Sequence, residues 1–211
     1  MSKGRVDRSE GKGSSHGPGT ERLIVGISGA SGVIYAVRLL EILKDSGIET
    51  HLVMSRAAEL TIAHELDRSP RDVRALASKV HPVANVGAAI ASGSFITMGM
   101  IIAPCSIRTM SEIATGVTSS LLTRAADVCL KERRPLVLAV RETPLHAGHL
   151  RTMAQLSDLG AIIAPVVPSF YARPQTLEEM IDHTVGRLLD QVGVHSGPVR
   201  RWTGEPVKPQ D

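Results

Sequence analysis

Residues 22–32 read RLIVGISGASG, an aliphatic run that passes directly into a loop of small residues. The run at 23–27 fits a strand that is buried on both faces, as strands of a parallel sheet are. The loop at 28–32 has no bulky side chain, so its backbone can approach a ligand closely. The helix expected after it would offer free N–H groups to an anion. The stretch predicts a strand, a ligand-binding turn and a helix, although a tight serine-capped turn without a ligand would fit too.

The alternation of strands and helices continues along the chain. Further aliphatic runs predict strands at 50–54, 98–103, 136–140 and 161–164. Apolar residues at helical spacing predict helices at 33–44, 56–65, 70–77, 109–114, 119–131, 146–159 and 177–192. Such alternation indicates an α/β fold with a doubly wound parallel sheet, Rossmann-like or flavodoxin-like. The sheet would lie between two helical layers in a three-layer sandwich.

Length and charge limit the architecture and the partners. The 211 residues suffice for a single domain with a full core. We expect a disordered N-terminal tail at 1–20, a folded domain at 21–194 and a C-terminal tail at 195–211. The formal charge is +3 and both signs are interspersed, which does not favour nucleic acid as a partner.

Apolar runs and cysteines bear on the cellular location. No apolar run approaches the roughly 20 residues that a membrane span needs, and the first residues lack the apolar stretch of a signal peptide. Cys105 and Cys129 lie in apolar or tight-turn surroundings without metal-ligand spacing. They fit reduced core thiols. We therefore expect a cytoplasmic protein with no metal site.

Polar loops follow most of the expected strands, at the edge where ligands bind in such folds. The loops read SGASG at 28–32, APCSIRT at 103–109, RETP at 141–144 and PSFY at 168–171. Their hydroxyls, guanidiniums and helix starts suit a phosphate or the polar edge of a flavin. The first loop is not GxGxxG, and the second strand ends in Met54-Ser55-Arg56, without the acidic residue that an NAD ribose needs. A mononucleotide is favoured over a dinucleotide, while each loop alone could be a capped turn or a surface ion pair.

Together these segments resemble the flavin prenyltransferase family. The resemblance covers about residues 22–202, and its motifs occur in family order: IVGISGASG at 24–32, APCSIRT at 103–109, RAADV through KERRPL at 124–136, RETPL at 141–145 and Phe170-Tyr171. It implies an enzyme that joins the dimethylallyl group of dimethylallyl phosphate to N5 and C6 of reduced FMN. The product, prenyl-FMN, would serve a partner decarboxylase. The family forms homododecamers with sites at subunit contacts.

The resemblance also implies roles for individual residues, carried over position by position. FMN would contact Gly29, Ala30, Ser31, Ser55, Ser106, Ile107, Arg108, Thr109 and Arg141. The prenyl phosphate would be bound by Arg124, Lys131, Tyr171 and Arg187. Proton movements would use Ser31, Glu65 and Glu142. Trp202 matches a late tryptophan near the prenyl site, so the C-terminal tail would close over that site.

The chain departs from the family in places, and alternatives stay open. Ser119-Ser120 stands where the family often has Asn, and HAGHL at 146–150 is closer to variants that accompany hydroxyaryl-acid decarboxylases. No aspartate-rich DDxxD segment is present, which favours a monophosphate donor and a metal-independent reaction. An FMN-dependent cysteine decarboxylase of the same fold is an alternative, although its Pro-x-Met-Asn-type segment is missing. A non-catalytic flavin-carrying subunit is another.

Overall fold

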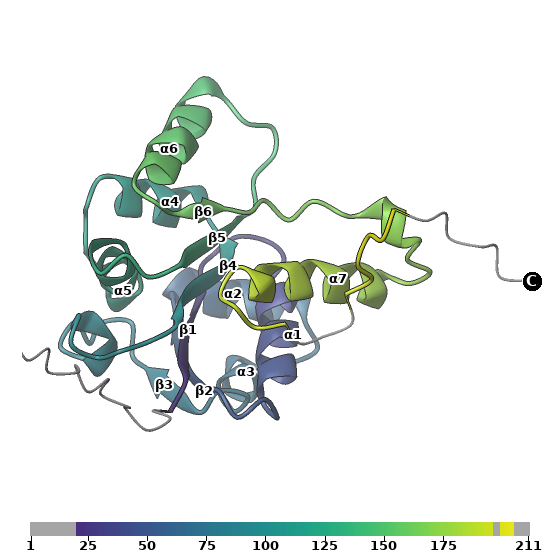
Figure 1. The fold of residues 1–211 in the computed structure, drawn as a ribbon. Coiled ribbons are helices and arrows are strands. Elements are labelled where there is room, and N and C mark those ends of the chain that lie inside the picture. The colour runs from purple at the N-terminus through teal and green to yellow at the C-terminus, as the bar shows by residue number, and fades with distance from the viewer. Residues whose placement is uncertain (1–19, 196–198, 205–211) are drawn as a thin grey trace, which may run out of the picture.

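The computed structural model describes residues 20–195 and 199–204. The expected N-terminal tail lies outside the described residues apart from Thr20, as do residues 196–198 and 205–211 of the C-terminal tail. A parallel sheet of six strands forms the centre, in the order β3-β2-β1-β4-β5-β6 (Figure 1). The order reverses between β1 and β4, which is the switch point of a doubly wound sheet.

The elements follow one another in the order that the sequence pattern predicts. The strands are β1 (Arg22–Ile27), β2 (Glu49–Met54), β3 (Lys79–His81), β4 (Gly99–Cys105), β5 (Leu136–Val140) and β6 (Ile162–Ile163). The helices are α1 (Ile34–Leu43), α2 (Arg56–Glu65), α3 (Pro70–Arg74), α4 (Ile107–Ala114), α5 (Leu121–Lys131), α6 (Ala147–Asp158) and α7 (Leu177–Asp190). Two short 3-10 turns are η1 (Ala89–Ala91) and η2 (Phe170–Ala172).

Two apolar clusters fill the two sides of the sheet. Successive residues of a strand face opposite sides, so Leu23 and Val25 of β1 pack with α1, α2 and α7, whereas Ile24 packs with α4, α5 and α6. The two groups of helices flank the strands in Figure 1. The expected three-layer arrangement is therefore confirmed, with the core built from aliphatic side chains.

The parallel register is continuous around β1. Leu23 pairs with Thr50 of β2 and with Gly99 of β4, so the three strands end at the same edge. The connection from β1 to β2 runs through α1, whereas the connection from β4 to β5 runs through α4 and α5 on the other face. The two connections therefore diverge at the carboxyl ends of β1 and β4, which is where doubly wound proteins bind ligands.

The prediction of five strands was wrong by one, because β3 was missed. Its three residues, Lys79–His81, are too few and too polar to show a strand period. Contacts with β2 hold it: Ser78 and Thr50 exchange side-chain and backbone hydrogen bonds, and His81 Nε2 lies 2.9 Å from His51 Nδ1. These contacts are long-range, so local sequence does not reveal them.

The helix boundaries also differ slightly from the predicted ones. The helix expected at 119–131 begins at Leu121, because the Ser120 side chain caps it by accepting from Thr123 N. The helix expected at 70–77 ends at Arg74. Among the helices of residues 20–195, none has the length and hydropathy to cross a membrane.

Candidate functional site

Ser28 joins the loops that follow β1 and β4. Its side chain is fully buried. The hydroxyl donates to the backbone oxygen of Pro104 at 2.8 Å and accepts from Ser106 N at 2.7 Å. Both loops are therefore fixed relative to each other at the switch point of the sheet. Ser28 was not assigned a role from the sequence. Its position as a polar residue directly after a fully apolar strand could have indicated one.

The Gly29–Gly32 turn is shaped by close approach and by unusual backbone angles. A Cβ on Gly29 would lie 2.3 Å from Cβ of Ala57, so the turn packs directly on the first turn of α2. Gly32 has a φ of +98°, which favours glycine. Within the described residues, the backbone N–H groups of Gly29, Ala30 and Ser31 donate no hydrogen bond. These N–H groups are free to bind an anion or the polar edge of a ring.

Glu65 closes the other side of the same turn. It is the last residue of α2, and its Oε2 accepts from Gly32 N at 2.8 Å and from Val33 N at 3.2 Å. Val33 is the N-cap of α1 and has no side chain that could cap the helix. Glu65 therefore caps α1 although it is more than thirty residues away in the sequence. Its carboxylate contacts the turn that contains Ser31, where proton movements were expected.

Two serines fix the helix starts at this edge. Ser55 Oγ accepts from Ala58 N at 3.1 Å and caps α2. Ser106 Oγ accepts from Thr109 N at 3.3 Å and caps α4. The N–H groups of Ile107 and Arg108 lie in the first turn of α4, where a helix has no internal partner for them. The N-termini of α2 and α4 therefore lie at the carboxyl edge of the sheet. Helix N-termini favour a negatively charged ligand.

The loop after β5 is attached to the same edge. Arg141 N donates to the backbone oxygen of Cys105 at 3.1 Å, which places Arg141 and Glu142 beside the Ser106 loop. Both side chains are exposed. The structure thus brings the expected flavin-contacting residues and the expected proton-handling residues to one edge of one chain: Gly29, Ala30, Ser31, Ser55, Glu65, Ser106, Ile107, Arg108, Thr109, Arg141 and Glu142.

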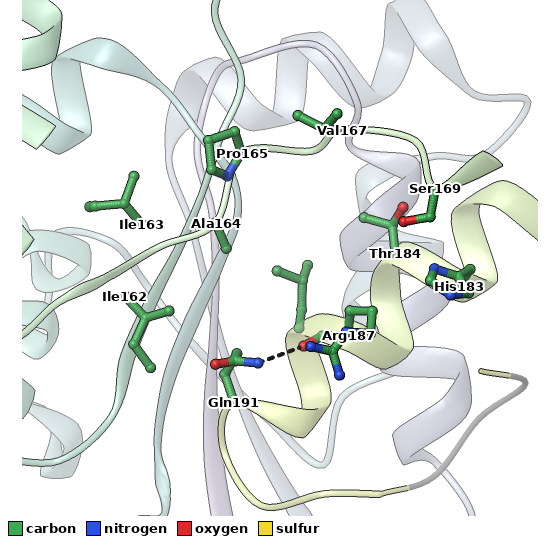
Figure 2. Close-up of a pocket in the computed structure, with 11 residues that line it drawn as sticks. Ile162, Ile163, Ala164, Pro165, Val167, Ser169, His183, Thr184, Arg187 and Gln191 are labelled. Carbon is green, nitrogen blue, oxygen red and sulfur yellow. Dashed lines mark hydrogen bonds between the residues drawn. The ribbon is translucent and has the colours of Figure 1, made fainter. Parts of the chain in front are cut away.

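A second group of site candidates gathers around α7. The Tyr171 and Trp202 rings meet edge to face with centroids 5.8 Å apart, and Tyr171 Oη lies 3.2 Å from Nε2 of the buried His183. Arg187 and His183 line a groove of about 280 Å³ between α7 and β6. In Figure 2 both residues lie on α7, with Arg187 beside Gln191 and His183 on the side of Ser169, away from Ile162. His183 was not named from the sequence, because its contact with Tyr171 depends on the fold.

Arg124 and Lys131 lie at opposite ends of α5, and Lys131 lies apart from the first group. Lys131 ends α5 shortly before β5 begins, so it lies toward the edge where the parallel strands start. The loops at 28–32 and 106–109 lie at the edge where the strands end. One chain therefore does not bring Lys131 beside these loops.

Most candidate cations are paired with a neighbouring carboxylate on the same helix or turn. The pairs are Arg108–Glu112, Arg124–Asp127, Lys131–Glu132 and Arg187–Asp190. The first three pairs are largely exposed and contribute about 0.2–1 kcal/mol each, so a phosphate could displace or share the partner at small cost. In the fourth pair Asp190 is only 7% exposed, so this argument does not apply to it. Arg141 makes no ion pair with any described residue, which leaves its guanidinium available.

The cysteines are unsuited to chemistry at this edge. Burial raises the pKa of the Cys105 thiol to about 12, and burial likewise raises the pKa of Cys129 to about 12. The thiolate is the nucleophilic form. Cys105 therefore serves the core beside the Ser106 loop, as the sequence predicted for a reduced core thiol.

An α/β sheet with capped helix starts at its switch point, and without a dinucleotide fingerprint, is typical of a mononucleotide-binding flavoprotein. The sequence profile of the Flavoprotein family matches residues 12–189, so the chain belongs to that family. It is 61% identical over 187 residues to flavin prenyltransferase UbiX of Escherichia coli K12, a match that covers 87% of this chain and 99% of that protein. The chain is thus a member of the flavin prenyltransferases.

Two solved structures resemble the fold closely. One is AnUbiX (PadA1) in complex with FMN and dimethylallyl pyrophosphate, with a TM-score of 0.87 and 45% identity, covering 89% of this chain and all of that one. The other is a dodecameric FMN-dependent Ubix-like decarboxylase from Escherichia coli O157:H7, with a TM-score of 0.84 and 47% identity. The latter match covers 87% of this chain and all of the other.

Proposed function

We propose that the protein is a flavin prenyltransferase that joins the dimethylallyl group of dimethylallyl phosphate to N5 and C6 of reduced FMN. The observation that carries this proposal is the switch-point edge, where Ser28 ties two loops together and N–H groups of residues 29–31 have no partner within the described chain. That edge belongs to a chain that is 61% identical to a flavin prenyltransferase. The product, prenyl-FMN, would pass to a partner decarboxylase.

The residues at this edge fit FMN. The free N–H groups of Gly29–Ser31 and the first turn of α4 would bind the phosphate and the polar edge of the ring. The Arg141 guanidinium, which has no carboxylate partner among the described residues, would add a charge-assisted contact. Small side chains leave room for the flat ring system, and the caps at Ser55 and Ser106 hold the helix starts in place.

The prenyl donor needs cations and hydroxyl donors around its leaving group. As the allylic C–O bond breaks, its electron pair and negative charge leave with the phosphate, and fixed cations stabilise that charge. Lys131, Arg187 and Tyr171, with Arg124 and Arg141 nearby, would supply these contacts. Reduced FMN supplies the two atoms that bond to the prenyl carbons, N5 and C6. The aromatic face of Trp202 would shield the allylic cation.

Ring closure needs two proton transfers: the prenyl double bond gains a proton as its other carbon bonds to C6 of the flavin, and C6 then loses its own proton. Glu142 follows β5 beside the Ser106 loop and is exposed, so it is available as a general acid or base. Ser31 would assist from the turn after β1. Glu65 would act in the same turn, where its second carboxylate oxygen makes no hydrogen bond to a described residue.

A homo-oligomer would bring the separate groups together. The solved relative from Escherichia coli O157:H7 is dodecameric, and a dodecamer of this chain would place Lys131 and Arg124 of one subunit at the flavin edge of another. The position of Lys131, away from the loops at 28–32 and 106–109 within one chain, supports this arrangement. The buried, free thiols of Cys105 and Cys129 support a cytoplasmic location for the assembly.

Phosphate release tests this function and the choice of donor. The protein is mixed with reduced FMN and dimethylallyl phosphate in the presence of EDTA, and inorganic phosphate is measured over time. We expect release that requires reduced FMN and survives chelation. Dimethylallyl pyrophosphate, which the solved relative binds, serves as the second donor; its leaving group, pyrophosphate, is measured in place of phosphate, and it should react more slowly. Release without FMN, or none with either donor, would contradict the proposal.

A further inference from the structure

Asp190 is the meeting point of three basic side chains. It is the last residue of α7, and its side chain is only 7% exposed. The carboxylate accepts from Arg187 Nη1 at 2.6 Å and from both terminal nitrogens of Arg201, at 3.1 and 2.8 Å. His195 Nδ1 lies 2.9 Å from it. Arg187 belongs to the same helix, whereas Arg201 comes from residues 199–204, here called the C-terminal segment.

The C-terminal segment touches the rest of the molecule at further points. Arg200 Nη1 donates to the backbone oxygen of Ala172 at 3.0 Å. The Trp202 ring packs edge to face on Tyr171. In Figure 1 the segment runs beside α7 and the turn η2. The paired hydrogen bonds between Arg201 and Asp190 fix direction as well as distance, as two-pronged arginine–carboxylate contacts do.

A carboxylate is an unfavourable residue at this place unless it has partners. The carboxyl end of a helix carries partial negative charge, which repels an acid and attracts cations. Arg201 first, and then His195 and Arg187, hold the pKa of Asp190 well below its usual range, so the group is charged throughout the physiological range. The contact thus persists at working pH and is not a pH switch.

We propose that Asp190 is a positioning residue that holds the C-terminal segment on α7 and orients Arg187, so that Trp202 and Arg187 lie ready for the prenyl phosphate. The proposal rests on the proposed function only for that last step. Arg187 uses one terminal nitrogen for Asp190, and among the described contacts its other N–H groups are free to bind phosphate. Removing the carboxylate would release Arg201 and leave Arg187 without its fixed orientation.

The single tryptophan makes the segment directly observable, because Trp202 is the only one in the chain. Time-resolved fluorescence anisotropy of the ligand-free protein reports motion of the indole on the nanosecond scale. We expect the Asp190→Asn variant to lose the slow anisotropy component that wild type retains. Trypsin should also cleave it after Arg201 several-fold faster than wild type. The Asp182→Asn variant is the control, since Asp182 lies on the same helix but pairs with Arg38 of α1.

A second variant guards against misfolding of the first. Arg201→Gln leaves α7 unchanged and removes the partner from the exposed segment. It should free Trp202 in the same way as Asp190→Asn, and Asp190→Glu should restore part of the slow component. Arg201→Gln lacks the trypsin site after residue 201, so it is judged by anisotropy alone. If both variants keep the slow anisotropy component of wild type and Asp190→Asn also keeps its trypsin resistance, the proposal is overturned.

Kinetics separate the positioning role from a merely structural one. The Asp190→Asn variant should raise KM for dimethylallyl phosphate by about tenfold, because the phosphate-binding groups are no longer pre-arranged. Its affinity for FMN should match that of wild type. A variant that frees Trp202 but keeps the wild-type KM would overturn the link to the prenyl phosphate. If wild type makes no prenyl-FMN while the fluorescence results hold, the proposed function fails and the contact stands.

Discussion

Glu65 stabilises the turn after β1, and we propose that it also takes part in proton transfer. Its Oε2 accepts two backbone N–H groups at the start of α1, which no side chain of α1 itself caps. A carboxylate at a helix N-terminus is also favoured by the helix dipole. The same contacts hold the glycine turn that follows β1. The catalytic role implied by the family resemblance therefore depends on a residue that also shapes the flavin edge.

Replacing Glu65 should cost stability. Glu65→Ala removes the acceptor from Gly32 and Val33, and we expect the free energy of unfolding to fall by about 1 kcal/mol. Glu65→Gln keeps an acceptor oxygen and should lose less. Urea denaturation measures both. Glu59→Ala on the same helix removes only an ion pair with Arg74 and should change stability by less than about 0.5 kcal/mol. A Glu65→Ala variant as stable as wild type would contradict the capping role.

Two further substitutions test the residues assigned to the prenyl donor and to proton transfer. Lys131→Ala removes a cation from the leaving phosphate, and Glu142→Gln removes the acid or base beside the flavin. Each should lower turnover by roughly 100-fold or more, since such groups act mainly on the transition state. FMN affinity, measured by fluorescence quenching of the flavin, should stay near wild type. Full activity in both variants would show that these site assignments are wrong.

At the scale of elements, the short edge strand β3 depends on the contact between the buried His51 ring and the half-buried His81 ring. His51 and His81 stack with centroids 5.1 Å apart, and Phe95 packs edge-on against His51. Glu49 Oε1 lies 3.2 Å from His51 Nε2, and Lys79 contacts the same carboxylate. A second positive charge between the stacked rings would be poorly solvated. The pair therefore favours neutral imidazoles in the folded protein.

This pair predicts how stability depends on pH. Burial, and then the neighbouring imidazole, lower the pKa of His51 from its usual value near 6.5, and burial followed by Lys79 lowers the pKa of His81. The unfolded chain therefore binds more protons than the folded chain below about pH 6.5. The free energy of unfolding should be constant above that pH, as far as these groups are concerned, and fall below it.

Thermal unfolding between pH 5 and pH 8 measures this effect. The His81→Gln variant should lose less stability at low pH than wild type, because it lacks one of the two groups whose pKa is lowered by folding. His64→Gln, at an exposed position on α2, should leave the pH dependence unchanged. If the His81→Gln and wild-type curves run parallel from pH 8 to pH 5, the pair does not titrate as described.

Local sequence predicts some elements and contacts well and misses others for physical reasons. The long strands carry unbroken aliphatic runs, and loops at the ends of parallel strands must share an edge, so most flavin-edge residues could be predicted. β3 could not be predicted, since a strand of three residues shows no period and its place in the sheet is set by contacts with β2. Ser28 and Asp190 were missed for a related reason: their roles arise from partners that are distant in sequence or in an irregular segment.

At the scale of the whole molecule, the candidate site residues are spread over separate parts of one chain. They lie at the switch-point edge, in the α7 groove and on α5, and Lys131 lies away from the loops at 28–32 and 106–109. Closed symmetric assemblies bring different surfaces of identical chains together. The exposed ring of Phe170 lies in the α7 region and would be covered in such an assembly.

Mixed oligomers test whether one site draws on more than one chain. Lys131→Ala and Arg187→Ala subunits are each expected to be nearly inactive alone. If Lys131 and Arg187 of one site come from different chains, co-expression should restore about a quarter of the sites by random mixing. Light scattering should give a mass near twelve times the 22.5 kDa of one chain. Mixed oligomers as inactive as the parents would place both residues of a site on the same chain.

The identity of the flavin after reaction tests the central claim most directly. The protein is incubated with chemically reduced FMN and dimethylallyl phosphate, and the released flavin is analysed by mass spectrometry. If the protein transfers the prenyl group, the flavin will be heavier than FMN by one five-carbon prenyl unit, and it will form only when protein and donor are both present. FMN recovered at its original mass, although the protein has bound it, would contradict the assignment of this edge to prenyl transfer.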